Sequence, residues 1–318
     1  MDASLHPFRR YDKNPILLRS DIPYLCNTVF NAAACKFKDR YVLLLRVEGL
    51  NGLSHLTLAY SEDGYEFAVE DSPWIMPSQD PTYEVYERYG IEDPRITPIG
   101  DTFYITYTAF GPYGPRGGIG YTKDFHHFQR VTLATTVDDK DLVLFPEKIG
   151  GNYVMLNRPG GIGKDGGSIW ITYSPDLVYW GKAKVVLSPE PGWSSSKLGI
   201  STPPIKTERG WLTFYHGVKQ TGSGRLYRIG ALLLDLKNPE QIVGYTSHFI
   251  FGPEESYERT GDVPNVVFPC GVILEPDRTI KMYYGAADTC IALAEANLDD
   301  ILGLCTTRQK RGGQLLKA

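Results

Sequence analysis

Tyr41-VLLL-Arg46 is the first of five related apolar segments in this chain of 318 residues. The other four are Phe103-YITY-Thr108, Tyr153-VMLN-Arg158, Trp211-LTFY-His216 and Ile280-KMYY-Gly285. Each segment is rich in aromatic and aliphatic residues and follows a short turn, whose sequence is KDR, GD, GGN, ERG or EPDR. Such a pattern predicts a β-strand that leaves a hairpin. Because the pattern recurs five times, the chain is predicted to be built from repeats.

Further strands complete each repeat. A preceding strand begins ten residues upstream, as in Asn31-AAACKF and Asp93-PRITPI. A following strand ends in a recurring turn, with the sequences AYSEDGYEF (59–67), GYTKDFHHF (120–128) and TYSPDLVYW (172–180), and more distant versions at 233–241 and 294–302. Five units of three or four antiparallel strands predict an all-β, five-bladed β-propeller that needs no helix. We expect residues 1–306 to form this single catalytic domain and residues 307–318 to be a basic C-terminal tail.

Composition excludes several functional classes. The net charge of −4 gives no general attraction to nucleic acid or to an anionic membrane. No apolar run approaches the roughly 18 residues of a membrane span, and the N-terminus has no signal-peptide core, so we expect a cytoplasmic protein. The five cysteines form no CxxC pair, which indicates neither a disulfide framework nor a zinc site. We therefore expect no metal and no cofactor. The 21 tyrosines are suited to flat polar ligands such as sugars.

The repeats predict which side chains meet. In an antiparallel hairpin the start of one strand lies beside the end of the next. Asn31 and Asp93 should therefore lie near Arg46, Arg158 and His216, and blades that share a central channel should bring all five to one mouth. A single arginine at the end of a strand often only reaches solvent. Basic or ionisable groups at equivalent positions of three blades favour a functional site instead.

Asp93 is the candidate general acid. An Asp before Pro is also common turn chemistry, so its position within the repeat is what favours the catalytic interpretation. Burial in an enclosed channel is expected to raise its pKa, as an acid that works near neutral pH requires. Glycoside hydrolysis needs a second carboxyl group. Asp288 is the first candidate, followed by Glu84, Glu87 and Asp262.

The predicted mouth is nevertheless richer in basic groups than in carboxylates. Arg158, Lys197 and His216 form a set that suits a bound dianion, because arginine forks onto oxyanions and lysine adds a point charge. If the dianion is inorganic phosphate, it can attack the anomeric carbon itself. No catalytic base is then required, and phosphate acts as a co-substrate.

Seven motifs occur along nearly the whole chain: Val29-Phe-Asn-Ala-Ala33, Gly90-IEDPRI-Thr97, Leu156-NRPG-Gly161, Ser196-KLGISTPP-Ile205, Gly210-WLTFYHG-Val218, Asp262-VPNVVFPC-Gly271 and Tyr283-YGAAD-Thr289. In these motifs and their order the sequence resembles glycoside hydrolase family 130, the β-mannoside phosphorylases. The resemblance implies a five-bladed propeller, as the repeats do.

The resemblance also implies roles for individual residues. Asp93 would be the general acid, either directly or through a hydroxyl of the bound mannose. Arg158, Lys197 and His216 would hold phosphate, and Asn31, Arg46 and Asp288 would hold the mannosyl unit. Attack by phosphate would invert the anomeric centre and yield α-mannose 1-phosphate and a shortened acceptor, in a reversible reaction. The partners would be manno-oligosaccharide and phosphate, and the resemblance implies a homo-oligomer.

Several alternatives remain at this point. The segment Tyr257-ERTGDVPNVVFPC-Gly271 resembles the β-1,2-mannoside group, but β-1,4-mannooligosaccharides and mannosylglucose are also substrates in the family. Some family members are hydrolases, although this sequence keeps the phosphate set of Arg158, Lys197 and His216. A furanosidase or arabinanase on the same architecture would need three carboxylates. A non-catalytic, sugar-binding propeller would explain the aromatic residues but not the basic mouth.

Overall fold

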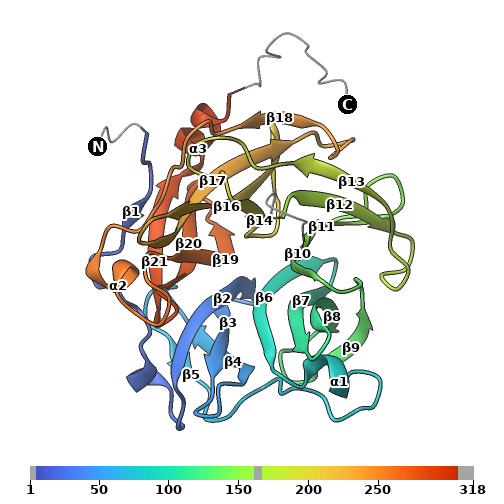
Figure 1. The fold of residues 1–318 in the computed structure, drawn as a ribbon, viewed down its shortest axis with the longest axis vertical. Coiled ribbons are helices and arrows are strands. Elements are labelled where there is room, and N and C mark those ends of the chain that lie inside the picture. The colour runs from blue at the N-terminus through green and yellow to red at the C-terminus, as the bar shows by residue number, and fades with distance from the viewer. Residues whose placement is uncertain (1–4, 161–166, 307–318) are drawn as a thin grey trace.

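The computed structural model describes residues 5–160 and 167–306, which form five antiparallel sheets arranged as blades around a common centre (Figure 1). This arrangement confirms the predicted all-β, five-bladed propeller. Blades 1 to 3 each have four strands, which are β2 (Thr28–Phe37), β3 (Arg40–Glu48), β4 (Ser54–Ser61) and β5 (Ala68–Val69); β6 (Ile91–Ile99), β7 (Thr102–Gly111), β8 (Gly114–Thr122) and β9 (Gln129–Leu133); and β10 (Asp139–Leu144), β11 (Tyr153–Pro159), β12 (Ile169–Ser174) and β13 (Gly181–Leu187).

Blade 4 has five strands because its inner edge is interrupted. It contains β14 (Lys197–Ile200), β15 (Ile205–Thr207), β16 (Gly210–Thr221), β17 (Gly224–Leu234) and β18 (Ile242–Tyr245). Both β14 and β15 pair with β16, one after the other. They therefore act as one inner strand with a break at residues 201–204.

Blade 5 joins the two ends of the chain. Its strands are β19 (Val267–Leu274), β20 (Thr279–Ala286), β21 (Cys290–Asn297) and, on the outside, the N-terminal strand β1 (Arg9–Arg10). Arg9 pairs with Glu295 and Arg10 with Ala294. The first strand of the chain thus completes the last blade, so the ring closes by strand pairing rather than by packing alone.

The core lies between the blades. Five hydrophobic clusters each join a pair of neighbouring blades, as when Leu43 of blade 1 and Tyr283 of blade 5 share one cluster and Val154 of blade 3 and Trp211 of blade 4 share another. Because neighbouring blades cover both faces of a sheet, a strand such as β3 can be apolar at consecutive positions, as in its buried run Val42–Leu45. All five cysteines are free and buried.

Strand pairing confirms the alignment of the five repeats. Arg46, Thr108, Arg158, His216 and Gly285 each lie on the second strand of a blade, and their partners on the inner strands are Phe30, Glu92, Lys140, Gly199 and Phe268. These five positions are therefore structurally equivalent. The recurring turn is also confirmed, because Asp63, Asp124 and Asp176 each accept two backbone N–H groups, from the residues two and three positions later.

The expectation that no helix is needed is wrong. Short helices occur at η1 (Arg19–Asp21), α1 (Glu84–Glu87), α2 (Ser256–Arg259) and α3 (Leu298–Leu304). The sequence 294–302 was expected to end in a strand turn, but Asn297 caps α3 by accepting from the N–H of Asp299 at 2.8 Å. Leu298, Ile301 and Leu302 bury one face of that helix. Within the described residues, no helix is long and apolar enough to cross a membrane.

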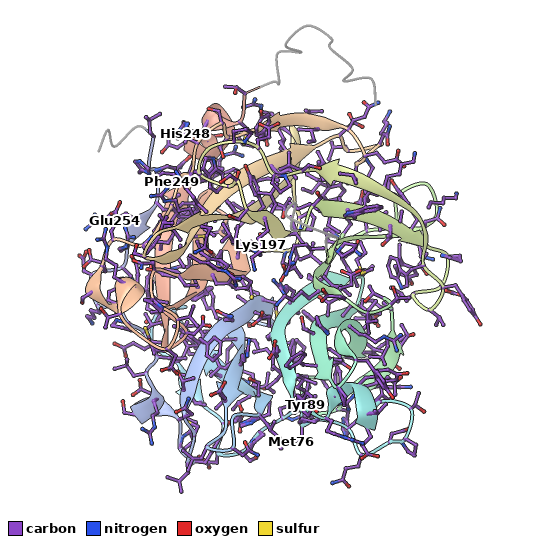
Figure 2. The ribbon with its side chains drawn as sticks, in the orientation of Figure 1. Met76, Tyr89, Lys197, His248, Phe249 and Glu254 are labelled. Carbon is purple, nitrogen blue, oxygen red and sulfur yellow. The ribbon has the colours of Figure 1, made fainter. Side chains whose placement is uncertain are left out.

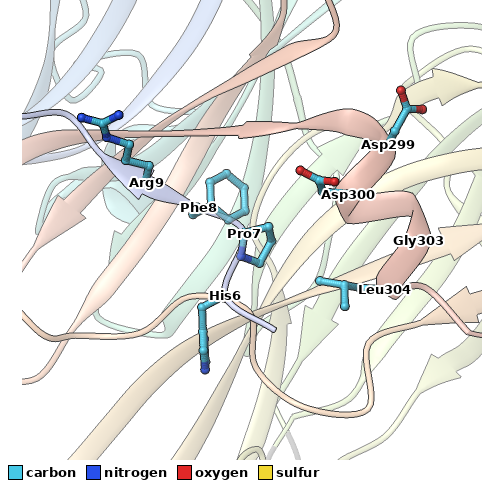
Figure 3. Close-up of a pocket in the computed structure, with 8 residues that line it drawn as sticks. All are labelled: His6, Pro7, Phe8, Arg9, Asp299, Asp300, Gly303 and Leu304. Carbon is cyan, nitrogen blue, oxygen red and sulfur yellow. The ribbon is translucent and has the colours of Figure 1, made fainter. Parts of the chain in front are cut away.

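A surface hollow of about 530 Å³ lies between the N-terminal segment and α3 (Figure 3). Its lining includes His6, Phe8 and Arg9 on one side and Asp300 and Leu304 on the other. None of the residues that line it is a candidate site residue. The tail 307–318 lies outside the described residues.

Candidate active site

Three polar residues occupy equivalent bulges in the inner strands of blades 1, 2 and 3. The strand register shifts between Phe30 and Ala33, between Glu92 and Arg95, and between Lys140 and Val143. The residues in these bulges include Asn31, Asp93 and Asp141, whose φ angles are 49°, 47° and 58°. A bulge with a left-handed residue re-aims a side chain that would otherwise follow the pleat. Each blade thereby directs one polar group toward its neighbours.

Asn31, Arg46 and Asp93 meet as predicted. The Asn31 amide Nδ2 donates to Asp93 Oδ1 at 2.8 Å, and Arg46 Nη1 donates to the same oxygen at 2.9 Å. Asn31 Oδ1 is buried and has no hydrogen-bond partner among the described residues. A Cβ on Gly285 would lie 2.0 Å from this oxygen, so only glycine allows the approach.

Arg46 is shared by two consecutive carboxylates, because its Nη2 also donates to Glu92 Oε1 at 3.0 Å. Burial alone would raise the pKa of Asp93, but the guanidinium groups of Arg46 and Arg95 and the amide of Asn31 outweigh it and hold that pKa below its usual value. The expected upward shift is therefore wrong for the free protein. The sequence does not show whether burial or a guanidinium at contact distance has the larger effect on this pKa. In the structure the guanidinium of Arg46 contributes most to lowering this pKa.

Asp288 lies in the β20–β21 turn and belongs to the same acidic cluster. Burial and the nearby carboxylates Asp93 and Glu92 raise its pKa to about 7, although Arg46 opposes the shift. Asp262, another sequence candidate, also raises the pKa of Asp288. Its Oδ2 accepts a hydrogen bond from Asn27 Nδ2 at 3.5 Å.

The remaining two carboxylate candidates lie elsewhere. Glu87 is fully buried and bonded to Tyr107 and Arg130, which gives it a structural role in α1. Glu84, also in α1, is exposed and pairs with Arg88 at 3.7 Å. Neither has a contact with Asp93 among the described residues.

Asp141 is the central residue that the sequence reasoning missed. Its Oδ2 accepts from Arg158 Nε at 2.7 Å and lies 3.5 Å from His216 Nε2. Although burial opposes ionisation, Arg158, His216 and Arg95 hold the pKa of Asp141 well below its usual range. A Cβ on Gly199 would lie 2.4 Å from both Asp141 and His216. The sequence signal was present, since Asp141-LVL starts an inner strand just as Asn31-AAA and Asp93-PRI do.

His216 is neutral in this environment. Burial and the positive charges of Arg158 and Lys197 lower its pKa to about 3, although Asp141 favours the charged form. Its Nδ1 lies 3.1 Å from Ser201 Oγ. His216 can therefore contribute a hydrogen bond to an anion, but not a positive charge.

Lys197 lies near the centre of the ring of blades (Figure 2). Burial, Arg158 and Lys140 lower its pKa to about 8. Its Nζ has no hydrogen-bond partner among the described residues and lies 5.4 Å from the centre of the Tyr227 ring. Lys140 and Tyr227 were not predicted as site residues. The signal for Lys140 was its position directly before Asp141.

Arg95 connects the two clusters. Its Nη1 donates to the main-chain oxygen of Asp93 at 2.9 Å, and its Nη2 lies 3.5 Å from Asp141 Oδ1. The side chain is 1% exposed and also donates to the main-chain oxygen of Ser201 at 3.1 Å. The buried guanidinium of Arg95 therefore links blades 2, 3 and 4 through hydrogen bonds.

The mouth therefore has two halves of opposite character. On blades 1, 2 and 5, the carboxyl groups of Glu92, Asp93 and Asp288 surround one guanidinium, that of Arg46. On blades 3 and 4, Arg158, Lys140 and Lys197 lie around the carboxylate of Asp141, and the carboxyl group of Asp139, whose pKa burial raises to about 7, lies near Arg158. All seven predicted site residues lie in these halves. In the described residues, no three His, Cys, Asp or Glu side chains are placed to share a metal ion.

Comparison with known proteins identifies the family to which the chain belongs. The family model described as beta-1,4-mannooligosaccharide phosphorylase matches residues 12–307. A beta-1,4-mannooligosaccharide phosphorylase of Ruminococcus albus is 34% identical over 92% of this chain and 89% of the relative. A 1,2-beta-oligomannan phosphorylase of Thermoanaerobacter is 35% identical over 92% of this chain and 98% of the relative.

A solved structure supports the same assignment. The beta-1,2-mannobiose phosphorylase of Listeria innocua, in complex with beta-1,2-mannobiose, superposes with a TM-score of 0.85 at 31% identity and covers 93% of this chain and 98% of that structure. A structure described as a GH130 glycoside hydrolase that targets β-1,2 mannosidic linkages shares the fold, with a TM-score of 0.81 at 24% identity over 94% of this chain and 96% of that one. Because the family model and the relatives extend over nearly the whole chain, the chain belongs to glycoside hydrolase family 130, the family of the β-mannoside phosphorylases.

Proposed function

We propose that this protein cleaves β-mannosides by inverting phosphorolysis, giving α-mannose 1-phosphate and a shortened acceptor in a reversible reaction. The observation that carries the proposal is the division of the mouth into an acidic half and a basic half. An inverting hydrolase needs a second carboxylate that activates water on the side opposite the acid. In the half opposite Asp93 the carboxylate of Asp141 is bound by Arg158, and the basic groups of Arg158, Lys140 and Lys197 favour phosphate as the nucleophile.

Phosphate is assigned to Arg158, Lys197 and His216. Of the three guanidinium nitrogens of Arg158, only Nε has a hydrogen-bond partner among the described residues. Its two terminal nitrogens are therefore available to donate two parallel hydrogen bonds to an oxyanion. Lys197 Nζ is likewise available, and neutral His216 can donate one hydrogen bond. The single negative charge of Asp141 orients Arg158 without cancelling the surrounding positive charge.

The mannosyl unit is assigned to Asn31, Arg46 and Asp288. The buried and unpartnered Oδ1 of Asn31 supports this role, because an orphaned acceptor is costly unless a ligand hydroxyl satisfies it. Sugar hydroxyls that engage Asn31 and Arg46 compete with the contacts that keep Asp93 ionised. The pKa of Asp93 then rises on substrate binding, and the carboxyl group gains the proton that it delivers, directly or through a mannose hydroxyl, to the leaving oxygen.

We further propose a β-1,2-linked manno-oligosaccharide as the substrate. Support comes from the Thermoanaerobacter relative and from a Listeria innocua beta-1,2-mannobiose phosphorylase, which is 38% identical over 80% of this chain and 69% of the relative. β-1,4-Mannooligosaccharide and mannosylglucose are the alternatives, since relatives at 34% and 30% identity carry those names.

The deciding experiment is product analysis with β-1,2- and β-1,4-mannobiose, each with and without inorganic phosphate. Phosphate-dependent formation of α-mannose 1-phosphate establishes both the reaction and the linkage. Release of free mannose at equal rates in both conditions identifies a hydrolase. Binding without turnover identifies a non-catalytic sugar-binding propeller.

We infer that residues 1–306 act as one catalytic domain, without a metal or cofactor, and that residues 307–318 add a basic tail. We place the enzyme in the cytoplasm, because its five cysteines are free and buried and that compartment keeps thiols reduced. We assign it sugar and phosphate as partners, and no nucleic acid or membrane. Light scattering after gel filtration tests the homo-oligomer that the family resemblance implies.

A further inference from the structure

The turn that carries Asp288 has an unfavourable backbone. Ala287 and Asp288 are consecutive non-glycine residues with φ angles of 47° and 53°. Residues other than glycine rarely adopt this left-handed conformation, and they keep it only where the surrounding structure holds them there. The position of the Asp288 carboxyl group therefore depends on contacts from outside the hairpin.

Two hydrogen bonds to this turn come from the segment 260–266, and a third comes from blade 1, where Thr28 Oγ1 donates to Asp288 O at 2.9 Å. The main-chain N–H of Ala287 donates to Val266 O at 3.0 Å, and the N–H of Val263 donates to Ala287 O at 3.1 Å. Gly261 packs so closely that a Cβ there would lie 2.4 Å from Ala287 O. Both main-chain polar groups of Ala287 are thus fixed by one loop.

Glu258 of α2 anchors this loop. Its main-chain oxygen accepts from the N–H of Val266 at 3.1 Å, and its side chain is fully buried. The carboxylate accepts from Tyr284 Oη at 2.8 Å. A buried carboxylate needs a cation as well, and among the described residues its one cationic partner is Arg10.

Arg10 reaches Glu258 from the N-terminal strand β1. Its Nε and Nη2 donate to the two carboxylate oxygens, each at 2.8 Å, and Nη2 also donates to Gly252 O at 2.7 Å. Its guanidinium stacks 4.5 Å from the centre of the Phe251 ring. A forked pair of this kind fixes direction as well as distance.

We propose that Arg10 is a positioning residue for the mannosyl subsite, acting through Glu258 and the segment 260–266 on the turn that carries Asp288. The strand that closes the propeller would thereby also set the geometry of sugar binding. The inference rests on the proposed function, because it takes Asp288 as a ligand of the mannosyl unit. Arg158 and Lys197, the residues assigned to phosphate, lie on blades 3 and 4. Their positions should not depend on this chain of contacts.

The test compares Arg10→Met with Arg9→Met, a matched control on the same strand. Arg9 is 81% exposed at its side chain, and its one ion-pair partner among the described residues is the exposed Asp12. We expect Arg10→Met to raise the KM for the mannoside roughly tenfold, with the KM for phosphate unchanged. Arg10→Lys, which keeps the charge but loses the fork, should give a smaller rise. Arg9→Met should match the wild type in both constants.

A double variant separates positioning from general loss of stability. If Arg10 acts through Asp288, adding Arg10→Met to Asp288→Asn should raise the mannoside KM little beyond that of Asp288→Asn alone. Full additivity, or equal increases in both KM values, would overturn the proposal. If Arg10→Met does not fold, Arg10→Lys with and without Asp288→Asn gives the same comparison. Wild-type protein without phosphorolysis would refute the proposed function itself, whereas an active wild type with an unaltered Arg10 variant refutes only this inference.

Discussion

Asp93 and Asp141 occupy equivalent bulges of neighbouring inner strands, and one side chain, that of Arg95, contacts both. Both carboxylates are buried, and basic neighbours hold both pKa values below the usual range. Their partners differ, however. Asp141 is bound by Arg158 and Arg95 and belongs to the framework of the site. Asp93 is bound by Asn31 and Arg46, the groups assigned to the sugar, so its surroundings can change when substrate arrives.

Replacing Asp93 by Asn should abolish turnover without loss of the fold. Removing a general acid typically costs about 10²- to 10⁴-fold in rate, and the amide can still accept from Asn31 and Arg46. The measurement is kcat for phosphorolysis, with circular dichroism to verify folding. Asp101→Asn is the control, because Asp101 is exposed and pairs with Lys123. An Asp93→Asn variant with more than a tenth of wild-type activity would exclude Asp93 as the acid.

Replacing Asp141 by Asn should mainly affect stability. The change leaves the buried guanidinium groups of Arg158 and Arg95 without their carboxylate, and breaking a buried ion pair costs roughly 3–5 kcal/mol. Urea unfolding at pH 7 measures this loss of free energy of unfolding. Asp101→Asn again serves as the control and should change little. A loss for Asp141→Asn no larger than that of the control would show that Asp141 does not hold the basic half together.

The KM for phosphate should rise between pH 7 and pH 9. Burial and the positive charges of Arg158 and Lys140 lower the pKa of Lys197 to about 8, so its charge is lost as the pH passes that value. Lys197→Arg keeps its charge and should show a flatter profile, while Lys197→Met should bind phosphate weakly at every pH. The comparison is made between the phosphate KM values of the three proteins, because Asp288, whose pKa is about 7, can itself change the mannoside KM over this range. A wild-type phosphate KM that stays constant over this range would contradict the assignment of Lys197.

The sequence was sufficient for the fold because each blade repeats the same buried strand pattern. The strand pairing of Arg46, Arg158 and His216 follows from the same repeat. Asp141 was not predicted as a site residue because the β10–β11 loop is longer than the β6–β7 turn. Asp141 is therefore two residues farther along the chain from Arg158 than Asp93 is from Thr108. The helix α3 was not predicted because its short segment was aligned with the turns that follow a strand in the other blades.

The electrostatics of the site could not be predicted from the sequence. Whether burial raises or contact lowers the pKa of Asp93 depends on the 2.9 Å distance to Arg46 Nη1, which no spacing along the chain specifies. The neutrality of His216 likewise depends on its burial beside Arg158 and Lys197. Motifs therefore identify the groups in the mouth, whereas the protonation state of each depends on the three-dimensional arrangement.

Asp288 should make the stability of the protein depend on pH. Burial, together with Asp93 and Glu92, raises its pKa from 3.8 to about 7 in the folded state. Between these values the folded protein holds a proton that the unfolded chain has released, so this contribution to stability falls as the pH rises from about 4 to about 7 and is constant above. Asp288→Asn lacks it. The free energy of unfolding of the variant, relative to wild type, should therefore increase from pH 4 to pH 7 and then level off. Asp139, whose pKa is also raised to about 7, is present in both proteins and cancels in the difference. A difference that is the same at pH 4 and pH 8, measured by urea unfolding, would show that Asp288 is not held in a desolvated, acidic cluster.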